Sequence, residues 1–210
     1  SFPLAACLLS RLYLKGNEVA SVVDYDKDKA DALLVVAADG GYVPALLDLA
    51  TEAEASSPPD YQAAHGYYSR AADLGDGHAL YKLGWMAQYG VVAAADLSAA
   101  HDFYTRATEV GGAEGWYGLG QLVQNGSGGE PDNAGAAAAY EKGAAQSEPM
   151  SETALAYLYE QGLGVERDYS RSLALLTDAV SQEYSFAKAA LSIHYLAGEG
   201  VDVDYSRAFN

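Results

Sequence analysis

Residues 151–180 read SETALAYLYEQGLGVERDYSRSLALLTDAV. Small and apolar residues recur at helical spacing on both sides of the glycine-containing turn at residues 162–164. Gly162 can end the first helix in a left-handed conformation that costs glycine no steric clash. Asp168 lies where its carboxylate can accept hydrogen bonds from the free amides of a second helix. The stretch therefore predicts two helices joined by a turn.

The same pattern recurs along the whole chain. Six Asp residues mark the expected starts of second helices and are separated by 34, 36, 36, 36 and 36 residues: Asp26, Asp60, Asp96, Asp132, Asp168 and Asp204. Six small residues open the first helices, each followed four residues later by Leu: Ala5, Ala45, Ala79, Gly115, Ser151 and Ala187. Helix pairs repeated at such a period stack into a solenoid. We predict an all-α solenoid (α/α superhelix) of about six helix-turn-helix repeats.

The landmarks place the repeats at residues 5–44, 45–78, 79–114, 115–150, 151–186 and 187–210, the last being incomplete. Each Asp is followed 19 residues later by the small residue that opens the next repeat, in all five cases. This constant part should set the stacking, since insertions in helical-pair repeats fall in loops. We expect one array that belongs to a longer protein. Further repeats or partner subunits should cover its apolar ends, which contain Leu4, Leu8, Leu9, Leu12 and Phe209.

Recurring positions also predict helix ends and core residues. Glycines at matching positions should end the first helices: Gly16, Gly90, Gly126, Gly162 and Gly198. Apolar side chains at repeated helix-packing positions should form the core: Leu9, Leu83, Leu119, Leu155, Leu191, Tyr159 and Tyr195.

These motifs resemble the Sel-1-like repeat, a relative of the tetratricopeptide repeat with the pattern small-x-x-x-Leu-Gly-x-x-Tyr, Gly-x-Gly-Val, Asp-x-x-Lys-Ala and Ala-Ala. The fifth repeat matches it in LAYLY at 155–159, GLGV at 162–165, DYSR at 168–171 and AV at 179–180. The sixth repeat matches it at Leu191, Tyr195, Gly198, Gly200, Val201, Asp204, Arg207 and Ala208. Repeats one to three lack Gly-x-Gly-Val, which affects the expected loop shape. The resemblance covers essentially the whole chain and implies an adaptor or scaffold.

Composition narrows the classes of partner and cofactor. The chain carries 29 acidic and 12 basic side chains, a formal charge of -17, which disfavours nucleic acid and anionic membrane surfaces as partners. No apolar run approaches the roughly 20 residues of a membrane-spanning helix. Cys7 is the only cysteine, and the four histidines form no H-E-x-x-H motif, so we expect neither a metal site nor a cofactor. The compartment stays undetermined.

First helices line the concave face of a solenoid, so their exposed positions are the expected contact sites. Aromatic side chains are common at such positions here and are enriched in binding hot spots. We predict a groove for a peptide or helix of a partner protein, formed by Tyr81, Trp85, Tyr89, Trp116, Tyr117, Gln121 and Tyr157. The alternative, that these side chains pack against neighbouring repeats, stays open.

The leading functional prediction is a non-catalytic scaffold or adaptor that binds partner proteins on its solenoid surface. The resemblance also implies a lumenal substrate-recognition adaptor of an endoplasmic-reticulum-associated degradation ubiquitin ligase, with the glycosylation sequon Asn125-Gly126-Ser127 as local support. A third alternative is a hydrolase similar to β-lactamase-like repeat proteins. Those relatives carry paired cysteines in each repeat, whereas this chain has one cysteine.

Overall fold

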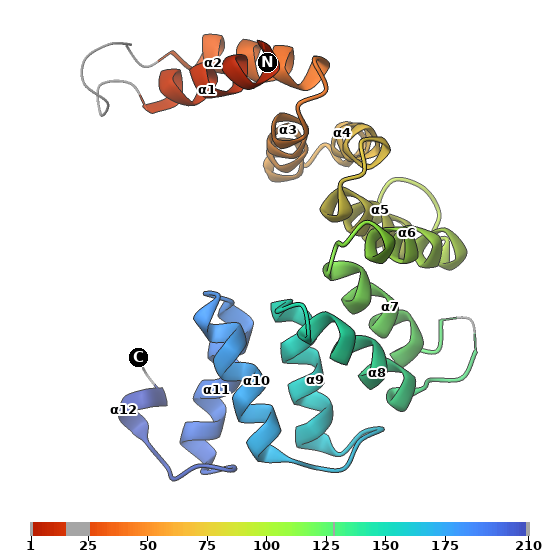
Figure 1. The fold of residues 1–210 in the computed structure, drawn as a ribbon, viewed down its shortest axis with the longest axis vertical. Helices are drawn as coiled ribbons and strands as arrows, with labels where there is room; N and C mark the ends of the chain where they lie inside the picture. Colours follow the sequence, from red (N-terminus) through yellow and green to blue (C-terminus); the bar gives the residue numbers. More distant parts are fainter. Residues whose placement is uncertain (1, 16–25, 128, 209–210) are drawn as a thin grey trace. The chain divides into compact units, whose positions relative to one another are not determined.

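The computed structural model describes residues 2–15, 26–127 and 129–208, and these residues form twelve helices and no β-strand (Figure 1). The first helices of the repeats are α1 (Phe2–Lys15), α3 (Val43–Ala55), α5 (Gly77–Tyr89), α7 (Glu114–Gln124), α9 (Pro149–Gln161) and α11 (Ser185–Ala197). The second helices are α2 (Lys27–Asp39), α4 (Tyr61–Asp73), α6 (Leu97–Glu109), α8 (Asn133–Ala144), α10 (Tyr169–Ser181) and α12 (Tyr205–Ala208). The predicted all-α repeat fold is confirmed.

The chain divides into two compact units, unit 1 (residues 1–95) and unit 2 (residues 96–210). Unit 1 contains α1 to α5, and unit 2 contains α6 to α12. Within each unit, every helix packs against the helices that precede and follow it in the chain. Figure 1 shows α9, α10 and α11 side by side in unit 2. Each unit is therefore a stack in which contacts are mostly between chain neighbours.

The six periodic Asp residues cap the second helices, as predicted. Each Asp carboxylate accepts a hydrogen bond from a backbone amide in the first turn; in α4 and α8 this bond is 2.9 Å long, from Ala63 N to Asp60 and from Gly135 N to Asp132. The others are Asp26, Asp96, Asp168 and Asp204. These bonds satisfy amides that have no partner inside the helix.

Three first helices end at a left-handed glycine, as predicted: Gly90, Gly162 and Gly198, with φ of 64°, 66° and 73°. In α7 the helix ends one residue earlier, with Asn125 as the cap and Gly126 following at φ 67°. The predicted Gly16 lies outside the described residues.

The largest buried side chains of the second helices lie eight residues after the capping Asp. This position holds Tyr68, Tyr104 and Tyr140 in three repeats, and each of these tyrosines is at most 1% exposed. Two of the hydroxyls reach back to the first helix of the same repeat. Tyr68 donates to Glu54 over 3.1 Å, and Tyr140 donates to Gln124 over 2.8 Å. These tyrosines were not among the core residues predicted from the sequence.

Helix α7 lies close to two of these rings. A Cβ built on Gly118 would lie 2.5 Å from the Tyr104 ring of α6, and one built on Gly120 would overlap the Tyr140 ring of α8. Any side chain at either glycine would force the ring or the helix to move. The two glycines therefore set how closely α7 approaches the second helices on both sides.

The predicted core positions are buried to different degrees. Leu83, Leu155 and Tyr159 are buried, as predicted, whereas three others are only half-buried: Leu119, Leu191 and Tyr195. The assignment of Leu9 to the core is wrong, because its side chain is 38% exposed. Counterparts of Leu9 pack against the second helix of the preceding repeat, and no such helix precedes α1 among the described residues.

We predict that Asp132→Ala lowers the free energy of unfolding by about 1 kcal/mol, because α8 loses its capping hydrogen bond. Urea unfolding followed by circular dichroism measures the change. Glu130→Ala removes a nearby exposed carboxylate of equal charge and should leave stability nearly unchanged. Equal effects of both substitutions would show that charge rather than capping is responsible.

We also predict opposite effects for two Gly→Ala substitutions inside helices. Gly120→Ala should destabilise the protein by about 1–3 kcal/mol, because the new methyl group overlaps the Tyr140 ring. Gly66→Ala in α4 should stabilise it by up to about 1 kcal/mol, since nothing lies within 4 Å of the added Cβ and Ala favours helix. Thermal unfolding of the two variants checks the pair; a stabilised Gly120→Ala protein would contradict the packing described above.

Candidate functional site

An open groove of about 400 Å³ runs along the first helices of unit 2. Its lining residues come from α7, from α9 and from the start of α11: Tyr117, Gln124, Met150, Thr153, Ala154, Tyr157, Tyr184 and Phe186. Tyr157 is 50% exposed and Phe186 is 73% exposed, so both rings are available to a partner. The groove is therefore a largely aromatic surface contributed by three successive repeats.

Several polar groups of the groove already have partners inside the protein. The Tyr117 hydroxyl accepts a 2.8 Å hydrogen bond from Gln121, and the Gln124 side chain accepts one from Tyr140. The Thr153 hydroxyl donates to the Pro149 carbonyl over 2.7 Å. Binding in this groove would therefore depend chiefly on contact with ring faces and apolar side chains.

The structure brings part of the predicted site together. Tyr117 and Tyr157 line the groove, and Gln121 adjoins it through its bond to Tyr117. Trp116 lies beside α8 instead, where Lys142 Nζ is 4.4 Å from the centre of its ring. Trp116 therefore packs within its own repeat.

The other three predicted residues, Tyr81, Trp85 and Tyr89, lie on α5 of unit 1. The rings of Trp85 and Tyr89 are 5.7 Å apart, and Tyr89 is 54% exposed. Lys82 Nζ lies 5.4 Å from the Trp85 ring centre and forms a 2.8 Å ion pair with Glu54. Tyr81, one turn before Trp85, is half-buried and lies 6.4 Å from the His78 ring. These residues form an aromatic row with a cation at its side.

Six lining residues of the groove were not among the predicted site residues: Gln124, Met150, Thr153, Ala154, Tyr184 and Phe186. Met150 and Phe186 occupy the same place in two successive repeats, one residue before Ser151 and Ala187. Both would have been predicted if the residue directly before each opening small residue had been counted among the contact positions.

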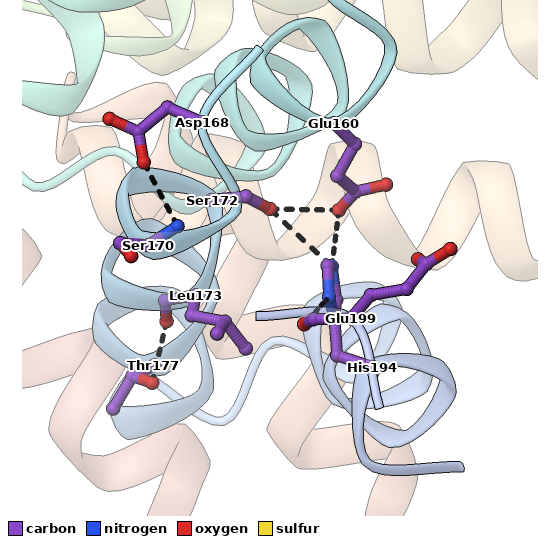
Figure 2. A network of polar contacts seen from close by, with 8 residues as sticks. All are labelled: Glu160, Asp168, Ser170, Ser172, Leu173, Thr177, His194 and Glu199. Carbon is purple, nitrogen blue, oxygen red and sulfur yellow. Dashed lines mark hydrogen bonds and ion pairs between the residues drawn. The ribbon is translucent and has the colours of Figure 1, made fainter. Parts of the chain in front are cut away.

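A polar cluster joins α9, α10 and α11, with Ser172 and His194 buried and Glu160 partly exposed (Figure 2). Ser172 Oγ donates to Glu160 Oε1 over 2.8 Å, and His194 Nε2 lies 2.7 Å from the same oxygen. His194 Nδ1 lies 3.0 Å from the Glu199 carbonyl, which can only accept, so Nδ1 carries a proton.

This cluster contains the residue types of a hydrolytic triad but not its arrangement. Ser172 donates to the carboxylate rather than to the imidazole, from which it is 3.5 Å away. Ser172 is 0% exposed and His194 is 2% exposed, so a substrate has no access to either side chain. A nucleophilic serine needs a base that takes its proton and a path for the substrate. The cluster therefore lacks the arrangement and the access of a catalytic site. Its hydrogen bonds connect α9 and α10 of the fifth repeat to α11 of the sixth.

Two buried glutamates lie at the start of α9: Glu148 caps the helix and Glu152 is in its first turn. Glu148 accepts hydrogen bonds from the Met150 and Ser151 amides, and Gln182 donates to Glu152 over 3.0 Å. Burial raises the pKa of both carboxyls, and the negative charge of Asp178 adds to the raised pKa of Glu152. Both glutamates lie at the start of α9, the helix that carries Met150 and Tyr157.

The part of the chain that the structure describes contains no group of three or more His, Cys, Asp or Glu side chains placed to hold a metal ion. None of its helices has both the length and the apolar character needed to cross a membrane.

The sequence profile described as Sel1 repeat matches six segments: residues 3–42, 43–76, 77–111, 113–148, 149–184 and 185–210. The chain belongs to the Sel1 repeat family. Proteins of this family are generally protein-interaction scaffolds. Each matched segment begins two residues before the repeat start inferred from the small residues, at 3 against 5 and at 149 against 151, for example. No curated protein sequence matches the chain.

Several solved structures share the fold. A Sel1 repeat protein from Oxalobacter formigenes superposes with a TM-score of 0.81 at 23% identity, over 99% of this chain and 82% of that one. A putative Sel1 repeat protein from Klebsiella pneumoniae gives 0.61 at 24% identity, over 85% and 88%. Immunity protein Pa5087 from Pseudomonas aeruginosa gives 0.64 at 20% identity, over 98% and 75%. At these identities the likeness concerns the fold alone.

We predict that Glu152→Gln becomes progressively more stable than the unchanged protein as the pH rises from about 4 to about 8. The pKa of Glu152 is raised by folding, so the folded state binds its proton more strongly than the unfolded chain. The contribution of this carboxyl to stability is therefore greatest at low pH and falls as pH rises through its folded pKa. Urea unfolding at several pH values measures the difference, with the exposed Glu130→Gln as control. A difference that shrinks with rising pH would contradict the expectation.

Proposed function

We propose that this Sel1 repeat protein is a non-catalytic scaffold that holds a segment of a partner protein in the groove of unit 2. One observation carries the proposal: Tyr117, Met150, Tyr157, Tyr184 and Phe186 converge from three repeats on one open groove. Aromatic side chains offer large contact area at low cost in conformational entropy. The general role of the family in protein interactions supports the same function.

The occupant that fits best is a peptide or helix with apolar side chains and a net positive charge. The apolar side chains match the exposed rings of Tyr157 and Phe186. The positive charge matches unit 2, where 17 acidic side chains stand against 6 basic ones. Opposite net charges accelerate encounter and favour correct partners over acidic ones.

The alternative functions have less support. The sequon residue Asn125 is exposed at the end of α7. A ubiquitin-ligase adaptor would be one special case of a protein-binding scaffold, and an exposed sequon does not favour it over other scaffolds. A hydrolase would need an accessible nucleophile, and the cluster around Ser172 is buried. No specific observation favours hydrolysis.

We predict that Tyr157→Ala/Phe186→Ala lowers capture of partner proteins at least about tenfold, since hot-spot aromatics each contribute on the order of 2 kcal/mol. Both side chains are largely exposed, so the fold should persist, which circular dichroism checks. The measurement is native affinity capture with quantitative mass spectrometry from the cells of origin. Capture should also weaken between about 0.1 and 0.5 M salt, because charges contribute to binding.

Two controls make this experiment specific. Tyr205→Ala removes a 66% exposed aromatic side chain of α12 outside the groove and should leave capture unchanged. Trp85→Ala/Tyr89→Ala tests the separate aromatic row of unit 1. Full capture by the groove variant would refute the proposed site, and loss only in the α5 variant would move the site to unit 1.

A further inference from the structure

Basic side chains of unit 2 lie over aromatic rings. The unit contains six basic side chains, and the charged groups of four of them lie at most 5.6 Å from a ring centre. The pairs are Lys142 over Trp116, Arg106 over Phe103, Arg171 over Tyr159 and Arg207 over Tyr195. A cation in this position is attracted to the negative face of the ring. Contact between a cation and a ring therefore recurs within this unit.

Two rings on the α11 side of the groove have no such cation. Tyr184 and Phe186 contact each other, with ring centres 5.6 Å apart, and Phe186 is 73% exposed. In the described part of the chain, no Lys or Arg side chain lies over either ring. Both residues line the groove. The pair therefore offers ring surface on which a cation from a partner can lie.

The charge beside this ring pair is negative. Glu148 accepts a 3.0 Å hydrogen bond from the amide of Met150, another lining residue. Burial raises the pKa of the Tyr184 hydroxyl, and the nearby charge of Glu148 raises it further. Burial likewise raises the pKa of Glu148, and the charge of Glu114 adds to this effect. None of the eight described lining residues is basic, so these carboxyls attract a cation that enters the groove.

A guanidinium group matches these features better than other side-chain groups do. It is flat and weakly hydrated, so it can stack on a ring while it remains charged. An ammonium group is more strongly hydrated and therefore loses more when it leaves water. An apolar side chain would contact the rings but would gain nothing from the negative charge, and a carboxylate would be repelled.

We propose that the groove of unit 2 recognises an arginine of its partner, whose guanidinium stacks on the exposed ring of Phe186 beside Tyr184. This role of Phe186 rests on the proposed scaffold function and specifies the side chain that anchors the partner. Tyr117 and Tyr157 remain for the apolar side chains of the same segment. The arginine supplies the positive charge that suits the acidic surface of unit 2.

Peptides that bind the whole 210-residue chain test this anchor. They are selected from a phage-displayed library of short random peptides, and those that still bind the Tyr157→Ala/Phe186→Ala variant are discarded. We expect the remaining, groove-dependent peptides to share an Arg at one fixed position. In synthetic copies, replacing this Arg by citrulline, which has nearly the same shape without the charge, should raise Kd about fivefold. Isothermal titration calorimetry measures both Kd values.

Phe186→Leu locates the cation. The substitution keeps an apolar side chain and the net charge of the protein but removes the ring, so the ratio of the citrulline and arginine Kd values should fall below about twofold. Tyr205→Leu removes a 66% exposed ring outside the groove and should leave the ratio unchanged. Circular dichroism checks that both variants fold.

The outcomes separate the anchor from the groove. Groove-dependent peptides without a fixed Arg, or with equal affinity in their arginine and citrulline forms, would overturn the arginine anchor and leave the scaffold function standing. An unchanged ratio in Phe186→Leu would also overturn the anchor, because the cation would then lie elsewhere. If no selected peptide depends on the groove, both the anchor and binding in the groove are refuted.

Discussion

The stack depends on the contact between buried side chains of the second helices and small residues of the first helices. The Tyr104 and Tyr140 rings press against Gly118 and Gly120, where even a Cβ would overlap or nearly overlap. Since such a contact tolerates little displacement, it fixes the distance between neighbouring helices. The Asp caps set where each second helix begins and therefore where its tyrosine or leucine enters the core.

The same arrangement leaves one side of the first helices free for binding. α7 and α9 use their small and leucine positions against second helices, so Tyr117 and Tyr157 project into the groove. Behind this surface, the packing is adjusted in the fifth repeat. Leu176 replaces the tyrosine there, and Glu160 accepts its hydrogen bond from Ser172 instead of from a phenol.

The period, the caps and most of the helix ends could be predicted from the sequence, because Asp and Gly have strong local preferences. The buried tyrosines could not, since tyrosine serves equally well in a core and on a surface. Leu9 was misassigned because burial depends on a neighbouring helix that local pattern does not reveal. Trp116 was predicted to line the groove because it adjoins Tyr117 in sequence. One residue step turns a helix by about 100°, however, and Trp116 lies beside α8 instead.

Hydrogen exchange of the whole chain, free and bound to a captured partner, would show whether the first helices of unit 2 hold a protein partner, because protection maps contact helix by helix. We expect slower exchange in α9 and in the first turn of α11, which carry Tyr157 and Phe186, with little change in α8 and α10. Protection confined to the second helices would contradict binding in the groove.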